Sequence, residues 1–340
     1  MVMSKALGVL AAAAWLPCAA AAVCDAGLSN SSGAKVPCFP LSGGTQIPQV
    51  AIGTWSGSFK DCNPADYTCV KQHARFAVDN WLHIGGTHVD SANDYRTQTS
   101  VAEALVASGI RREDVFITTK CPGTIGYEAT IQCADDNLQM LGQFGTEGVA
   151  YIDLLLIHFP FTQSAVCRFK RNDPDCKMKM ADKAALQDTW KAMEELKRIG
   201  VVKSIGVSDY SVDQMAQTLE GAKFPIELNQ VEWNALQHDD DMLAYCKKNN
   251  IRLQAWSPLG GARGSVLGEA PVKAAAAAHN VSTAQVALRW SLQQGVAVVV
   301  GTASPEHQKG DLAIFDFELT DDEMKAISAL QPKATAPVLL

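Results

Sequence analysis

Four titratable side chains lie at or just after the ends of short β-like runs, where together they could protonate a carbonyl oxygen. They are Asp90 and Tyr95 in HVDSANDY, Lys120 in FITTK and His158 in LLLIHFP. A phenol is a poor proton donor at neutral pH, because its ordinary pKa is about 10, but a neighbouring ammonium lowers that pKa. A carboxylate would hold the ammonium, and an imidazole would donate a hydrogen bond to the carbonyl oxygen. The set therefore indicates carbonyl reduction, provided that a hydride donor is present.

Each of these side chains also has an ordinary structural explanation when it is taken alone. A strand-end aspartate is often a helix cap, a lysine is usually solvated, and tyrosine and histidine are commonly packed core residues. Their placement at the ends of three different strands is what favours a shared function.

The chain alternates short apolar runs with longer amphipathic ones. The apolar runs have the length and composition of parallel strands covered on both faces. They lie at residues 49–53, 86–89, 115–119, 152–157, 203–207, 227–231, 252–256 and 296–300. Between them, apolar residues recur at helical spacing, as in residues 183–199. Eight strands, each followed by a helical run, predict the α/β class and a single (β/α)8 TIM barrel.

Two features around the barrel are also predicted. Residues 35–50 contain two β-like runs around Ser42-Gly43-Gly44, which predicts an N-terminal β-hairpin that closes the barrel floor. The longest irregular segments, 159–182 and 257–270, follow the fourth and seventh strands. Both therefore lie at the carboxyl ends of strands, where barrels of this class carry their chemistry.

Residues 1–22 have the composition of a signal peptide. One cation, Lys5, precedes an apolar run, and Ala20 and Ala22 fit a cleavage site before Val23. The alternative is an uncleaved anchor, which Pro17 and the alanine-rich end disfavour. We expect one barrel domain over residues 23–340, secreted or delivered to the lumen of the secretory pathway or to an organelle beyond it.

Eight of the ten cysteines are sequence neighbours, and an oxidising compartment favours such pairs as disulfides. The pairs are Cys24 with Cys38, Cys62 with Cys69, Cys121 with Cys133, and Cys167 with Cys176. Spacing alone leaves the connectivity open. Of the other two, Cys18 lies in the leader and Cys246 is expected to be a buried free thiol.

Composition argues against several classes of protein. The 340 residues are 47% hydrophobic and 19% charged, with a formal net charge of −7. This acidic balance leaves no basic face for nucleic acid, and no internal run reaches the roughly 20 apolar residues that a membrane span needs. Histidines such as His83 and His88 do not form ligand pairs, so no metal is expected. We expect a monomer that acts on a small molecule.

Six separated motifs resemble those of the aldo-keto reductase family. They are HVDSANDY, FITTK, DLLLIHFP, GVSDY, ELNQVEWN and AWSPLGG, and the resemblance extends from about residue 36 to residue 330. It implies NAD(P)H-dependent reduction of aldehydes and ketones to alcohols. In this family's catalytic tetrad, Tyr95 would be the proton donor, Lys120 paired with Asp90 would lower its pKa, and His158 would orient the carbonyl group.

The resemblance also implies where cofactor and substrate bind. The implied cofactor positions are Gly53, Thr54, Trp55, Asp90, Ser208, Asp209, Gln230, Trp256, Ser257, Pro258, Leu259, Gly260, Gly301, Thr302, Ser304, His307 and Asp311. The substrate would contact Trp55, His158 and Phe159, and Phe161 would extend this apolar wall.

The chain departs from the family pattern at the cofactor positions. Asp209 replaces the usual asparagine, and a carboxylate accepts hydrogen bonds but donates none. Gly301, His307 and Asp311 replace the lysine, arginine and asparagine that usually follow the last strand. Two cations for the 2′-phosphate are thus missing, so NADPH is expected as the family's usual cofactor and NADH stays an alternative.

A second function of a different class is also open. The chain could be a secreted or lumenal barrel that binds NADP(H) as a sensor or regulatory subunit without significant turnover. The altered phosphate loop favours this alternative, whereas the complete tetrad argues against it.

Overall fold

The computed structural model describes residues 24, 36–55, 62–63, 66–142, 151–163, 177–260 and 264–330. Eight parallel strands close into a barrel in which β3 follows β12, so the predicted (β/α)8 architecture is confirmed. The strands are β3 (Val50–Gly53), β4 (His88–Asp90), β5 (Phe116–Cys121), β6 (Ile152–Ile157), β9 (Val202–Ser208), β10 (Leu228–Glu232), β11 (Arg252–Trp256) and β12 (Ala297–Val300). The strand bounds expected from the sequence agree with these within two residues.

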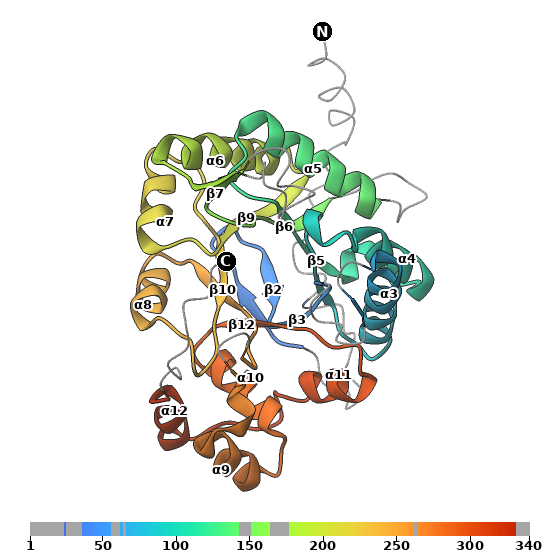
Figure 1. The fold of residues 1–340 in the computed structure, drawn as a ribbon, viewed down its shortest axis with the longest axis vertical. Coiled ribbons are helices and arrows are strands. Elements are labelled where there is room, and N and C mark those ends of the chain that lie inside the picture. The colour runs from blue at the N-terminus through green and yellow to red at the C-terminus, as the bar shows by residue number, and fades with distance from the viewer. Residues whose placement is uncertain are drawn as a thin grey trace.

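Helices surround the strands and cover the outside of the barrel (Figure 1). They are α3 (Tyr67–His83), α4 (Gln98–Ser108), α5 (Tyr127–Leu141), α6 (Lys183–Arg198), α7 (Val212–Leu219), α8 (Asp240–Lys248), α9 (Ala270–His279), α10 (Thr283–Gln293), α11 (Pro305–Leu312) and α12 (Asp321–Ser328). Short 3-10 helices occur at η2 (Asn93–Tyr95), η3 (Arg112–Asp114) and η5 (Val266–Gly268). In the described residues, no helix combines the length and the apolar character needed to cross a membrane.

The apolar runs form strands because both of their faces are covered. All six residues of β6 are buried, and so are all six of β5. Such continuous burial is expected of parallel strands between a barrel interior and a ring of helices. Gly206 in β9 is required by the close packing, since a Cβ atom there would lie 2.5 Å from the carbonyl oxygen of Leu228.

The predicted hairpin closes one end of the barrel. Strands β1 (Cys38–Pro40) and β2 (Gln46–Pro48) pair antiparallel, with Phe39 opposite Ile47. Leu41 and Ile47 are buried in one apolar cluster with the barrel residues Phe116, Leu154, Leu156 and Leu228. Figure 1 places β2 across the middle of the strand ring. The hairpin therefore seals the end of the barrel opposite the carboxyl ends of the strands.

The segment at 159–182 is not irregular throughout, as the sequence suggested. Its two ends pair as an antiparallel ribbon of β7 (Phe161–Gln163) and β8 (Met178–Met180). Three residues per strand give too little apolar alternation to indicate a strand from the sequence. The ribbon places the start and the end of this segment side by side, next to the end of β6.

Three of the four expected disulfides are confirmed. Cys24 pairs with Cys38, Cys62 with Cys69 and Cys121 with Cys133, with Cα–Cα separations of 6.1, 5.7 and 5.9 Å. The pair Cys167 and Cys176 and the leader at 1–22 lie outside the described residues. Cys246 is a buried free thiol as expected, and burial raises its pKa to about 12. Disulfides are typical of oxidising compartments, and the secretory location stays a prediction.

We expect the protein to lose stability between pH 6.5 and pH 4 because of His88 inside the barrel. Burial lowers the pKa of His88 from 6.5 to about 4. Between these two pH values the unfolded chain binds a proton at His88 and the folded chain does not, so lower pH favours unfolding. The free energy of unfolding should fall by about 3 kcal/mol over this range on account of this residue. Urea unfolding at several pH values measures the effect. His88→Gln should remove this part of the slope and His83→Gln, at an exposed position, should keep it; equal slopes in both variants would contradict the assignment.

Candidate active site

A buried ion pair lies at the carboxyl ends of β4 and β5. The ammonium of Lys120 is 2.6 Å from Asp90 Oδ1, and both side chains are almost completely buried. Lys120 also donates to the carbonyl oxygen of Ser91 at 2.9 Å, and Asp90 Oδ2 accepts from the amide of Gln230 at 2.8 Å. Burial of a charged pair is tolerated only where hydrogen bonds replace the lost water. These bonds fix both charged groups in one orientation.

Tyr95 lies next to this pair at the end of η2. The Lys120 ammonium is 5.1 Å from the centre of the Tyr95 ring. The ring of His158, which follows β6, meets the Tyr95 ring edge-on with centroids 5.4 Å apart. The structure thus brings together the four side chains that the sequence singled out from three strand ends. Their roles in a reaction stay predictions.

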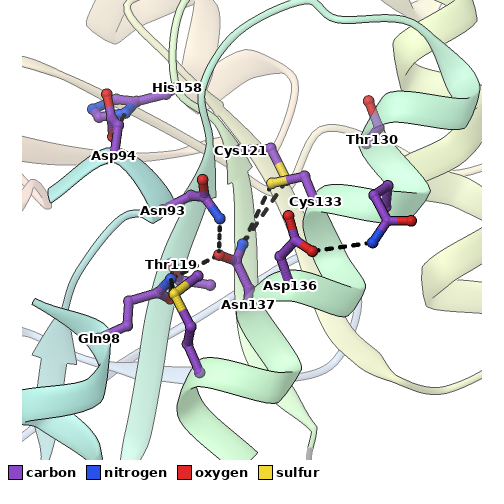
Figure 2. The surroundings of a disulfide bond; sticks show 12 residues. Asn93, Asp94, Gln98, Thr119, Cys121, Thr130, Cys133, Asp136, Asn137 and His158 are labelled. Carbon is purple, nitrogen blue, oxygen red and sulfur yellow. Dashed lines mark hydrogen bonds and ion pairs between the residues drawn. A yellow bond between two sulfur atoms is a disulfide. The ribbon is translucent and has the colours of Figure 1, made fainter. Parts of the chain in front are cut away.

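A hydrogen bond to Asn137 of α5 holds η2 in place, and the first residue of α4 bonds to the same oxygen (Figure 2). The amide of Asn93, the first residue of η2, donates to Asn137 Oδ1 at 2.9 Å, and Gln98 donates to the same oxygen at 2.8 Å. The other end of the Asn137 amide lies against the sulfur atoms of Cys121 and Cys133. Cys121 directly follows Lys120 in β5, so this disulfide links the lysine strand to the helix that anchors η2.

Asp94 makes a polar contact with His158 that the sequence did not predict. Its Oδ1 lies 3.0 Å from Nδ1 of His158, and the two side chains are only 11% and 8% exposed. Figure 2 shows the two groups facing each other. His158 also stacks on Phe159, with ring centres 4.1 Å apart. The signal was present in the motif HVDSANDY, because Asp94 directly precedes Tyr95 and so lies on the same turn.

A second group of predicted residues lies at the ends of β9, β10 and β11. The indole N–H of Trp256 donates to Asp209 Oδ1 at 3.0 Å. The hydroxyl of Ser208 and the backbone N–H of Asp209 both donate to the carbonyl oxygen of Gln230 at 2.9 Å. Burial raises the pKa of Asp209 from 3.8 to about 7. Because Gln230 also binds Asp90, this group and the ion pair form one hydrogen-bonded network.

The predicted phosphate-binding residues surround the N-terminus of α11. Ser304 is the N-cap and accepts from the backbone N–H of His307, and the Thr302 hydroxyl accepts from the backbone N–H of Ser304. Nδ1 of His307 lies 3.4 Å from the Thr302 hydroxyl. Gly301 and His307 are exposed. Asp311 is buried within α11, and burial raises its pKa to about 7.

The remaining predicted residues lie at the same end of the barrel. Thr54, just after β3, is buried and donates to the carbonyl oxygen of Asp90 at 3.1 Å, and Gly53 ends β3. Trp55 is 54% exposed, and the Phe159 and Phe161 rings are 6.5 Å apart. After β11, the residues Ser257, Leu259 and Gly260 are partly buried and Pro258 is buried. Phe159 stacks on His158, so an apolar ring lies beside the imidazole.

One group within the described ranges has metal-ligand geometry: Cys62, Cys69 and His73. The two cysteines form a disulfide, which removes the thiolates that a metal would need. The group lies at the start of α3 and does not include any predicted catalytic residue.

The model of the aldo/keto reductase family matches residues 49–332 of this chain. The chain belongs to the aldo/keto reductase family. A relative, an aldo-keto reductase of Mycolicibacterium smegmatis, is 31% identical over 296 residues, which cover 87% of this chain and 94% of that protein. The family resemblance inferred from the six motifs is therefore confirmed.

Solved structures of aldo-keto reductases share the fold. One, from Brucella melitensis, has a TM-score of 0.71 and 32% identity, covering 86% of this chain and 99% of that one. Another, from Bombyx mori in complex with NADP, has a TM-score of 0.75 and 27% identity, covering 87% of this chain and 93% of that one.

We expect Lys120→Met to destabilise this aldo-keto reductase more than replacing both members of the ion pair. The single substitution leaves the Asp90 carboxylate buried without its cation, at a cost of about 3–5 kcal/mol. The double variant Lys120→Met/Asp90→Asn should recover part of that loss because no charge stays buried. Urea unfolding of the three proteins gives the comparison. A double variant as unstable as the single one would contradict this account of the pair.

Proposed function

We propose that this chain reduces aldehydes or ketones to alcohols, with a reduced nicotinamide dinucleotide as the hydride donor and Tyr95 as the proton donor. One observation supports this most directly: the buried Lys120–Asp90 pair lies against the Tyr95 ring, and the His158 ring meets that ring edge-on. A developing alkoxide is protonated most easily where an acid can donate to it and a cation and an imidazole can stabilise its charge, and all three groups meet here.

The protein's own groups would divide the work as follows. The bound cofactor supplies the hydride. The hydroxyl of Tyr95 gives its proton to the carbonyl oxygen, and the ammonium of Lys120 stabilises the phenolate that is left. Asp90 holds the ammonium in place. Phe159, stacked on His158, would exclude water from one side of the reacting group.

The donors and acceptors at the ends of β9, β10 and β11 fit the nicotinamide end of a dinucleotide. Ser208, Asp209 and Gln230 present polar groups for a carboxamide, and Trp256 offers a flat indole fixed by its bond to Asp209. Because the pKa of Asp209 is raised to about 7, a large fraction of this group is protonated at neutral pH. A protonated carboxyl can donate a hydrogen bond as well as accept one, as the usual asparagine does.

The other end of the cofactor would lie at α11. The N-terminus of this helix, with Thr302 and Ser304, offers hydroxyl and backbone donors to a phosphate. His307 is exposed beside them, with Nδ1 near the Thr302 hydroxyl. The Bombyx mori relative binds NADP. We therefore propose NADPH as the cofactor, with NADH as the alternative that the missing lysine and arginine leave open.

Tyr95→Phe should reduce the rate of NADPH-dependent aldehyde reduction by about 10²–10⁴-fold, because the proton donor is removed while the ring remains. Cofactor binding, measured by the quenching of tryptophan fluorescence, should stay near the wild-type value. An aromatic aldehyde and an aliphatic ketone are suitable substrates. Reduction by this variant at close to the wild-type rate would contradict the role of Tyr95.

The same assay separates the enzyme from the sensor. The sensor alternative expects tight binding of NADP(H) by the wild-type protein and no consumption of NADPH with any aldehyde or ketone. Turnover that depends on Tyr95 would exclude it.

We expect the affinity for NADPH to decrease by about tenfold between pH 6 and pH 8. The reason is that Asp209, with a pKa of about 7, loses the proton that it would donate to the carboxamide. Fluorescence titrations across this range test the expectation. Asp209→Asn should bind NADPH with a weaker dependence on pH than the wild type, and Asp213→Asn, at an exposed position on α7, should behave as the wild type does. A wild-type affinity that does not change with pH would contradict the proposed contact.

A further inference from the structure

The pair formed by Asp94 and His158 has a consequence for how the imidazole meets a carbonyl group. A histidine ring has two polar atoms, and here Nδ1 is 3.0 Å from Asp94 Oδ1. A carboxylate only accepts hydrogen bonds, so Nδ1 must carry a hydrogen and donate it. In the neutral ring, Nε2 then has no hydrogen. It could accept a hydrogen bond, but it could not donate one.

A substrate carbonyl oxygen is also only an acceptor. A neutral His158 held in this way would place two acceptors against each other. Nε2 can donate to the carbonyl oxygen only if the ring carries both hydrogens, as the imidazolium. The Asp94 carboxylate stabilises that cation, because the contact is short and the two groups are nearly buried.

We propose that Asp94 is a positioning residue that keeps His158 protonated, so that His158 orients and polarises the carbonyl group as an imidazolium. This inference rests on the proposed function and states how the substrate is held. During reduction, a bound reduced nicotinamide would supply the hydride for the new C–H bond, losing one C–H bond of its own and becoming oxidised as the carbonyl is reduced. The Tyr95 O–H bond breaks as the substrate O–H bond forms, and His158 keeps both of its hydrogens. The Tyr95 phenolate then recovers a proton from water.

The other charged groups around the histidine are compatible with this state. Within the described part of the chain, the titratable side chain of Tyr95 on η2 lies beside His158, with ring centres 5.4 Å apart. Lys120, on β5, lies beyond the Tyr95 ring and would oppose a second cation, but Asp90 on β4 offsets its charge at 2.6 Å. The next residue along the chain, Phe159, stacks its uncharged ring on His158. Among the described residues, the carboxylates of Asp90 and Asp94 thus lie beside the ammonium of Lys120 and the ring of His158.

Asp94 is well placed for this role because it shares η2 with Tyr95. The three-residue helix carries the proton donor and the group that orients the histidine, and Asn93 anchors it to α5 (Figure 2). A contact between Asp94 and His158 therefore also fixes the tyrosine relative to the end of β6. Testing the proposal requires a measurement that separates the protonation of His158 from simple support of the helix.

The direct measurement is long-range ¹H–¹⁵N NMR of the full-length protein, labelled in its histidine rings, with and without NADP⁺. The His158 signals are assigned by their loss in His158→Gln. We expect Nδ1 of the wild type to be protonated throughout and Nε2 to lose its hydrogen above the ordinary histidine value of about 6.5. In Asp94→Asn, this midpoint should fall by about one pH unit or more. The control Asp316→Asn, at an exposed position, should match the wild type.

Kinetics supply the second readout. The kcat/KM for an aldehyde should fall as the pH rises through the His158 midpoint, and in Asp94→Asn this fall should occur at lower pH. At pH 7, kcat in that variant should be lower by about tenfold or more, while NADPH binds normally. Asp94→Glu should restore part of the rate and of the midpoint, because it keeps the carboxylate.

The outcomes are separable. A wild-type His158 whose neutral form carries its hydrogen on Nε2, or an unchanged midpoint in Asp94→Asn, would overturn the inference even if the enzyme reduces aldehydes. If the wild type reduces no aldehyde or ketone, the proposed function fails, and the NMR titration still decides on the pair. If Asp94→Asn does not fold, the tautomer of the wild type and the behaviour of Asp94→Glu decide instead.

Discussion

The site depends on one buried ion pair, between Lys120 on β5 and Asp90 on β4. Neither charge is in contact with bulk water, so the fold must supply their hydrogen bonds. Ser91 accepts from the ammonium, and Gln230 donates to the far oxygen of the carboxylate. Each of these partners comes from a different strand end or from the turn after it. The pair therefore fixes the relative positions of β4, β5 and β10 and the place at which a phenol can lie against a cation.

The tyrosine itself is on an element that could not be stable alone. A single turn of 3-10 helix has too few hydrogen bonds to offset the conformational entropy lost on forming it. Here, η2 is held at both of its first two residues, by Asn93 to Asn137 and by Asp94 to His158. The Cys121–Cys133 disulfide joins the strand of Lys120 to the helix of Asn137. The distance between the lysine and the tyrosine is thus set by covalent and hydrogen-bonded links that run through α5.

The sequence predicted the barrel well because burial on both sides of a parallel strand leaves a plain apolar run, as in IDLLLI at 152–157. It also predicted that the four titratable groups meet, since the carboxyl ends of all eight parallel strands lie at one end of the barrel. It did not predict the partner of His158, because which side chain of η2 faces the imidazole depends on how this turn is oriented. It missed the β7–β8 ribbon because strands of three residues have no detectable periodicity. Side chains at strand ends can therefore be predicted from the sequence, whereas contacts that depend on the conformation of a turn cannot.

The departures from the family pattern at Asp209 and Asp311 have a common physical basis. Both replace an asparagine with a carboxyl group of nearly the same shape, which at first sight exchanges a donor for a negative charge. Burial raises the pKa of each to about 7, so near neutral pH each is a mixture of acid and carboxylate. The acid form retains the ability to donate that the asparagine had. In the proposed cofactor site, burial therefore offsets much of the chemical difference between the two residue types. If Asp209 and Asp311 contact the cofactor as proposed, its binding would depend on pH near neutrality.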